Sequence, residues 1–106
     1  MFDFPKWSVW LEEKTREMGE RGLKAEFRVG PSDGPKPGMG MGIIGLNAMA
    51  DFASWTTGET DYTIMAPVSP EGKMVSHRWG LVLDDESFEM TFDEFIDEFR
   101  KFETPS

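Results

Sequence analysis

The sequence predicts a single α+β domain over residues 1–106, in which an antiparallel meander sheet of four to five strands carries an N-terminal and a C-terminal helix packed on one face. Three observations lead to this prediction. Apolar residues recur at helical spacing near both ends of the chain. Between the ends, apolar and polar residues alternate, as they do in strands that are exposed on one side. Short stretches with turn-forming residues separate the alternating segments, so consecutive strands are expected to pair.

The first helix is expected over residues 5–20, where Trp7 and Leu11 fall on one apolar stripe. Asp3 is the expected N-cap, because a carboxylate there can accept a hydrogen bond from the first turn. The next stretch, LKAEFRV over residues 23–29, alternates strictly between apolar and charged residues. It is therefore expected to form a half-exposed strand.

The stretch GPKPGMGMGIIG, residues 34–45, has the glycine density of a phosphate-binding loop. A dinucleotide fingerprint, however, needs a strand before the glycines and a helix after them, and a P-loop needs Gly-Lys followed by Ser or Thr. Neither context is present. We therefore predict a loop over 30–42 and a strand over 43–50, with Met39 and Met41 in the loop as candidate contact residues because Met adapts to irregular surfaces.

The segment 51–83 predicts three further strands. DFASWTT and TDYTIMA flank Gly58 and Glu59 as a hairpin. PVSPEG, over 67–72, is expected to form a second turn, which leads into the strand KMVSHRWGLVL over 73–83. One face of that last strand is predicted to carry Val75, His77, Trp79 and Leu81.

The C-terminal helix is signalled by TFDE, residues 91–94, which matches a capping box. Thr91 is expected to cap the helix and Glu94 to reach back to it. Met90 and Phe95, on either side of the cap, match a hydrophobic staple. The buried stripe of this helix is predicted to consist of Phe92, Phe95, Ile96, Phe99 and Phe102.

The net charge of −9 is concentrated near the C-terminus, where residues 84–106 hold nine acids against Arg100 and Lys101. Such a surface repels nucleic acid and anionic lipid and attracts a basic partner. The alternative, that the acids only keep the protein soluble, stays open. The chain has no cysteine, which excludes disulfides and fits a cytoplasmic protein. The N-terminus lacks the pattern of a signal peptide, and no apolar run has the length of a membrane span.

Candidate catalytic residues are few. His77 is the only histidine and could serve acid–base catalysis with Asp61 or Glu59, but its place in a strand favours a structural role. The serines sit in no nucleophile-elbow pattern, and the acidic run 84–94 lacks the ligand spacing and central Gly of a calcium loop. We therefore expect no enzyme activity, no cofactor and no metal site, and we expect a binding protein instead.

Part of the sequence resembles a known group of binding proteins. FDFPKWSVWLEEKTREMGERGLKAEFRV looks like the opening helix and first strand of small immunity proteins of bacterial polymorphic toxin systems. SWTTGETDYTIMAPVSPEGKMVSHRW is similar to the Trp–Gly–acidic hairpin of the TriTu group, through Trp55, Gly58, Glu59 and Asp61. The acidic stretch FDEFIDEFRKF completes the pattern, whereas residues 30–42 depart from it.

The resemblance implies a protein of the bacterial cytoplasm that is encoded beside a toxin, often at a type VI or Rhs-type locus. Such a protein binds the toxin domain tightly and occludes its active site. For the TriTu group the toxin is an ADP-ribosyltransferase that acts on elongation factor Tu. Because immunity proteins diverge quickly, the resemblance does not fix the identity of the toxin, and residues 30–42 put it most in doubt.

We therefore expect stoichiometric neutralisation of a toxin domain whose contact surface is basic, with neither nucleic acid nor membrane as a partner. Large aromatic residues beside the hairpin turn are the expected anchors, although core packing is an open alternative for them. Two other classes also stay open: a nucleic-acid mimic that blocks a basic groove, and an acidic adaptor or secretion chaperone. The predicted partner-binding residues are Trp55, Glu59, Asp61, Tyr62, Asp84, Asp85, Glu86, Asp93, Glu94, Asp97 and Glu98.

Overall fold

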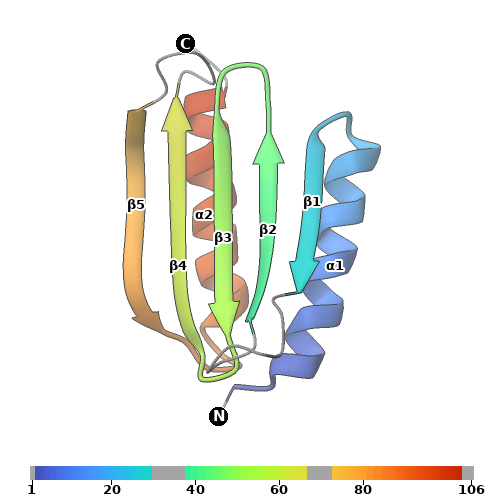
Figure 1. Ribbon diagram of the computed structural model, residues 1–106, viewed down its shortest axis with the longest axis vertical. Helices are drawn as coiled ribbons and strands as arrows, with labels where there is room; N and C mark the ends of the chain where they lie inside the picture. Colours follow the sequence, from blue (N-terminus) through green and yellow to red (C-terminus); the bar gives the residue numbers. More distant parts are fainter. Residues whose placement is uncertain (1, 30–37, 67–72, 104–106) are drawn as a thin grey trace.

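The computed structural model describes residues 2–29, 38–66 and 73–103 (Figure 1). Part of the predicted loop, 30–37, and the predicted turn at 67–72 lie outside the described residues. The elements, in chain order, are α1 (Phe4–Glu20), β1 (Lys24–Val29), β2 (Gly38–Ile44), β3 (Met49–Trp55), β4 (Glu59–Ala66), β5 (Lys73–Val82) and α2 (Phe88–Glu103).

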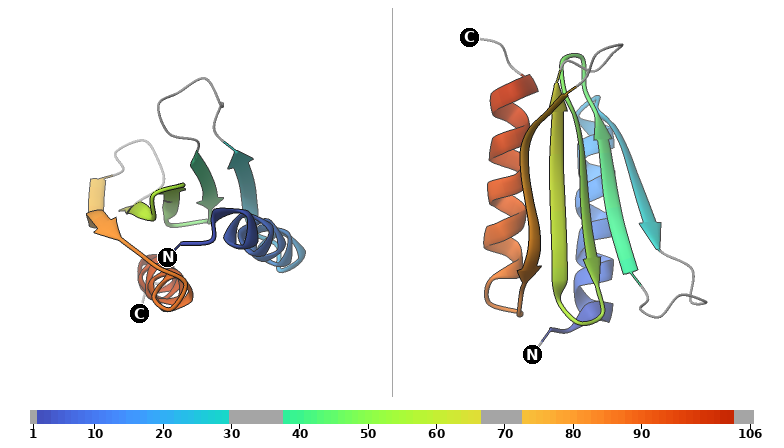
Figure 2. Two further views of the ribbon diagram at one scale, coloured as in Figure 1. Left: turned by 90° about the horizontal axis from the view of Figure 1, so that it is seen from below. Right: turned by 60° about the vertical axis from the view of Figure 1, so that its left-hand side comes forward.

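The five strands form one antiparallel sheet in the order β1-β2-β3-β4-β5, so each strand pairs with its neighbour in sequence. Both helices lie on the same side of this meander, as the end-on view in Figure 2 shows. The predicted fold class is therefore confirmed. Neither helix in the described parts of the chain combines the length and apolarity that crossing a membrane requires.

The core lies between the sheet and the helices and is rich in aromatic rings. Phe52 of β3 is fully buried at its centre. Its ring centroid lies 5.7 Å from that of Phe88, 5.4 Å from that of Phe92 and 5.1 Å from that of Phe95, all on α2. Full burial of one such side chain contributes roughly 1.5–3 kcal/mol, so this cluster fixes α2 on the sheet.

The Gly/Met stretch forms strand β2, so the prediction of a loop through residue 42 is wrong. Gly and Met alternate from Gly38 onwards, and this period of two directs Met39 and Met41 into the core. Both Met side chains are buried, and they are therefore not contact residues. The predicted strand over 43–50 is also wrong, because β2 ends at Ile44 and a turn precedes β3.

The glycines of β2 make room for a side chain that crosses the strand. Arg28 of β1 forms an ion pair with Asp51 of β3, two strands away. A Cβ atom on Gly42 would lie 3.3 Å from Nη1 of Arg28, and one on Gly40 would lie 3.5 Å from Nη2. The guanidinium group therefore lies against β2 where side chains are absent. This packing is a physical reason for Gly at both positions.

Helix α1 begins as predicted. The Asp3 carboxylate accepts a hydrogen bond from the backbone N–H of Lys6 at 3.2 Å, which is the expected N-cap. Trp7 and Leu11 are buried against the core. The chain then enters β1, where Phe27 packs against the core and the charged residues face away from it.

Helix α2 begins one turn earlier than predicted, and the capping box is wrong. Thr91 lies inside the helix, where its N–H donates to the carbonyl oxygen of Ser87 at 3.0 Å. The turn before the helix is closed by Asp84 and Ser87, which accept hydrogen bonds from each other's backbone N–H at 2.9 and 3.0 Å. The predicted staple also fails, because Met90 is 68% exposed. The predicted apolar stripe is confirmed: Phe92, Phe95, Ile96 and Phe99 are buried, and Phe102 packs against the core.

Candidate protein-binding surface

The side of the sheet opposite α1 and α2, here called the outer face, carries several of the predicted contact residues. Strand pairing places Ala53 opposite Asp61, and Thr63 opposite His77. Because side chains alternate between the two faces, Trp55, Asp61 and His77 share the outer face. Glu59, two residues before Asp61, is half-buried on the same face.

A bulge in β5 shapes one end of the outer face. Tyr62 pairs with Arg78 and Thr60 pairs with Leu81, so three residues of β5 span two of β4. Arg78 and Leu81 consequently both face the helices. The prediction that Leu81 shares a face with His77 and Trp79 is therefore wrong.

Gly80 is the residue that permits this bulge. Its φ of 72° lies in the left-handed region, which favours glycine. Its backbone N–H donates to Oδ1 of Asp61 at 2.8 Å. The Asp61 carboxylate is thereby held against the peptide bond between Trp79 and Gly80. A second irregularity leaves Val75 without a partner in the pairing of β4 with β5.

Exposed apolar side chains accompany the bulge along β5, which is an edge strand. Trp79 is 59% exposed, and its ring centroid lies 4.4 Å from that of His77. Val82 is 74% exposed, and Met74, farther along the strand, is exposed as well. Exposed apolar patches with a polar rim are typical of interaction sites. This end of the outer face is therefore the leading candidate for a contact surface.

Trp55 is half-buried on the outer face, beside the hairpin turn. A Cβ atom on Gly38 would lie 3.0 Å from both Cδ1 and Nε1 of its indole. The indole therefore lies across β2 at the position of Gly38. This contact fixes the direction of the ring while part of it stays accessible.

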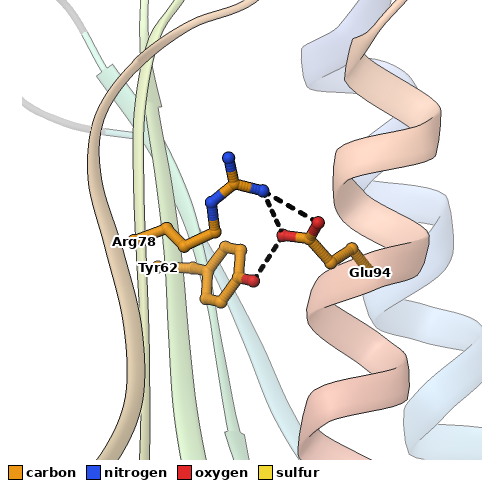
Figure 3. Close-up of polar contacts among 3 residues, drawn as sticks. All are labelled: Tyr62, Arg78 and Glu94. Atoms are coloured by element: carbon orange, nitrogen blue, oxygen red, sulfur yellow. Dashed lines mark hydrogen bonds and ion pairs between the residues drawn. The ribbon is translucent and has the colours of Figure 1, made fainter.

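Tyr62, in contrast, faces the helices and is only 2% exposed. Its hydroxyl donates to Oε2 of Glu94 at 2.5 Å. Arg78 donates to both oxygens of the same carboxylate at 2.8 and 2.7 Å, and Figure 3 shows the three side chains together. These three residues, here called the Tyr62–Arg78–Glu94 clamp, join the sheet to α2. Tyr62 and Glu94 therefore hold the fold together, and Tyr62 is not available as an exposed anchor.

The clamp shifts the pKa values of Tyr62 and Glu94 in opposite directions. Burial, together with the hydrogen bond to Glu94, raises the pKa of the Tyr62 hydroxyl far above its ordinary value. The Tyr62 hydroxyl and the Arg78 guanidinium lower the pKa of the Glu94 carboxyl. At neutral pH the clamp is therefore a neutral phenol bound to an ionised carboxylate, which is also paired with a cation.

Asp84 and Asp85 are also used within the fold. Asp84 closes the turn before α2, and hydrogen bonds from Ser87 lower the pKa of its carboxyl. Asp85 accepts from the backbone N–H of Asp3 at 2.7 Å and from Nε1 of Trp7 at 2.9 Å, and these two donors lower the pKa of its carboxyl. Asp85 thereby ties the start of α1 to the turn before α2.

The remaining predicted acids lie on or just before α2, on the other side of the sheet from Trp55 and Asp61. Glu86, Asp93 and Asp97 are exposed, and Glu98 is half-exposed. The structure thus divides the predicted site into two surfaces. A partner that contacted both would have to wrap around the edge of the sheet.

The other end of the outer face is hollowed. A groove of about 580 Å³ runs over strands β1 to β4. Its apolar walls include Ile44, Met49 and Met65, and the ion pair of Arg28 and Asp51 borders it. The outer face therefore combines a recess at one end with protruding rings at the other.

Sequence reasoning missed Trp79 as a contact residue. The alternation of β5 grouped it with Leu81, which packs against the core. The signal that was available is the Trp-Gly pair, because a glycine inside a strand pattern suggests a bulge. In the part of the chain that the structure describes, no group of three or more His, Asp or Glu side chains is placed to hold a metal ion.

Comparison of the chain with models of known protein families, with curated proteins and with solved structures found no match.

Proposed function

We propose that this protein is an immunity-type inhibitor, which neutralises a toxin domain in the bacterial cytoplasm by stoichiometric binding. The observation that carries the proposal is the exposed aromatic end of the outer face. There Trp79 and His77 protrude beside the Asp61 carboxylate. Aromatic anchors beside a charged rim are the usual make-up of an interface that binds strongly.

The charge of the chain supports a basic partner. Net charge −9 on 106 residues produces a negative potential that accelerates encounter with a positive surface. Two of the described arginines are already paired, Arg28 with Asp51 on the outer face and Arg78 with Glu94 on the helix side. In this proposal the acids on α2 contribute to steering, and the outer face makes the contact.

Neutralisation by such a surface requires no chemistry from the inhibitor. A bound sheet face covers the active site of the toxin and excludes its substrate. The likeness of the hairpin to the TriTu group makes an ADP-ribosyltransferase domain the first candidate toxin. A DNA-binding or nuclease domain is the rival target. It would bind the acids of α2 instead of the outer face, and DNA would compete for the same basic groove.

Co-expression tests the proposal. The C-terminal domain encoded by the neighbouring gene is induced in bacteria with the wild-type protein, with Trp79→Ala or with Met90→Ala. Met90 is a matched control because it is exposed to a similar degree but lies on α2. We expect growth rescue and co-purification for the wild type and Met90→Ala, and loss of both for Trp79→Ala. A harmless neighbour that does not co-purify would overturn the proposal and would favour an adaptor or chaperone.

A further inference from the structure

We propose that the corner formed by Trp79 and Asp61 on the outer face receives an arginine side chain of the partner, whose guanidinium group stacks on the indole and pairs with the carboxylate. This inference rests on the proposed function, because it specifies one contact of the same surface. It concerns the chemistry of the residue that is bound, whatever the toxin's activity.

The two groups of the corner have fixed positions. The backbone N–H of Gly80 donates to Oδ1 of Asp61 at 2.8 Å. This bond holds the carboxylate beside the peptide that follows Trp79. The His77 ring lies against the indole at a centroid distance of 4.4 Å with the planes tilted by 37°. The indole nevertheless keeps 59% of its surface exposed. An exposed ring supported by a neighbour, with a carboxylate held at the peptide that follows the same residue, is a preorganised site for a flat cation.

Charge selects the class of side chain. A cation above an indole is attracted by the ring quadrupole, and the guanidinium of arginine stacks on aromatic faces while it donates hydrogen bonds in its own plane. An acidic side chain would be repelled by Asp61, and an apolar one would leave the carboxylate without a new partner. Lysine carries the charge but cannot stack as a plane, so we expect it to bind more weakly.

The corner can be tested without the toxin. The probe is the peptide acetyl-Gly-Gly-Arg-Gly-Gly-amide, titrated into ¹⁵N-labelled protein while the indole N–H resonance of Trp79 is followed by NMR. The matched neutral probe replaces arginine with citrulline, which keeps the shape of the side chain and removes its charge. We expect a shift at Trp79 and Gly80 that is smaller with the citrulline peptide, by about threefold or more, because the cation–π and ion-pair attractions are lost.

Three variants make the result decisive. Asp61→Asn keeps an oxygen acceptor for Gly80 and removes the charge, so the arginine response should fall toward that of citrulline, because the ion pair is lost while the cation–π attraction remains. Trp79→Leu, read at the Gly80 amide, should also lower the response, because the cation–π attraction is lost, and serves as the second test if Asp61→Asn does not fold. Asp97→Asn, on α2, should leave the response unchanged. Equal shifts with both peptides, a full response in Asp61→Asn, or shifts confined to α2 would each overturn the inference. Growth rescue in co-expression would still stand in that case, so the two proposals fail separately.

Discussion

The backbone N–H of Gly80 donates to the carboxylate of Asp61 at 2.8 Å, at the point where β5 bulges away from β4. The bulge sets which side chains of β5 reach solvent. On one side of the bulge Arg78 turns to Glu94, and on the other Leu81 turns to the core. Trp79, between them, is left on the outer face.

Removing the acceptor should destabilise the bulge. We expect Asp61→Ala to lower the free energy of unfolding by about 1 kcal/mol, because the N–H of Gly80 loses its partner. Asp61→Asn should lose less, since its amide oxygen can still accept. Gly80→Ala should cost about 1–2 kcal/mol, because alanine is strained at positive φ. Steric clash should add nothing, since no atom of the described residues lies within 4 Å of a Cβ atom at this position. Urea unfolding measures the free energy of unfolding of all three variants. Equal losses for Asp61→Asn and Asp61→Ala would contradict the role of the Asp61 carboxylate as the acceptor.

The ionisation of Tyr62 can be followed by tyrosinate absorbance without interference, because it is the only tyrosine in the chain. Its folded pKa is raised above its ordinary value of 10.0, so the neutral phenol stabilises the fold fully below pH 10. This contribution is lost as the pH rises above 10. Tyrosinate absorbance should therefore appear at higher pH in the native protein than in urea. Tyr62→Phe should remove the corresponding alkaline decline in stability.

The same titration separates the two causes of the raised pKa. In Glu94→Gln the hydrogen-bonded negative charge is gone, but burial, the larger cause, remains. We therefore expect the tyrosinate transition of this variant to fall between those of the native and the unfolded wild type. A transition identical to that of the native wild type would show that Glu94 does not engage Tyr62 in solution.

The turn between β2 and β3 is held by the end of α2. Glu103 accepts from the backbone N–H of Leu46, Asn47 and Ala48 at 2.8–2.9 Å. A Cβ atom on Gly45 would lie 2.3–2.5 Å from this carboxylate. We expect Gly45→Ala to displace Glu103 and to cost about 1–3 kcal/mol, because the turn donors lose their acceptor.

A double-mutant cycle checks this explanation. In a Glu103→Ala background, Gly45→Ala should cost close to nothing, because the group that it displaces is already absent. Thermal or urea unfolding of the two single variants and the double variant gives the coupling. Additive losses would mean that Gly45 is needed for a reason other than the room that it leaves for Glu103.

The sequence predicts elements well where one local pattern determines them. The alternation of 23–29 and the Asp3 cap gave β1 and the start of α1, and the Phe stripe gave the buried side of α2. The failures share a different cause. The glycines predict a loop at 38–42, yet Gly40 and Gly42 make room for an arginine that crosses from β1, and Gly38 makes room for Trp55. Whether a glycine ends a strand or makes room for a neighbour depends on the strand beside it, which no local pattern reveals.

The candidate site was only partly predictable for the same reason. Trp55, Glu59 and Asp61 do share the outer face, as expected for alternate residues near one hairpin. Glu94 matched a capping box in sequence, but its actual partners, Tyr62 and Arg78, are 32 and 16 residues away. Such long-range pairing leaves no local signature, so an acid that holds the fold together looks the same in sequence as one that is free to bind.

The central claim is that the outer face, rather than α2, binds the partner. The most direct measurement is the affinity of the toxin domain for two matched double variants, Asp61→Asn with Trp79→Ala and Asp93→Asn with Asp97→Asn. We predict at least a 100-fold rise in Kd for the first, since losing a central aromatic anchor and a paired charge costs roughly 2–4 kcal/mol or more. The second should change Kd only slightly and should mainly slow association at low salt. The reverse order of effects would contradict the claim and would place the binding surface on α2.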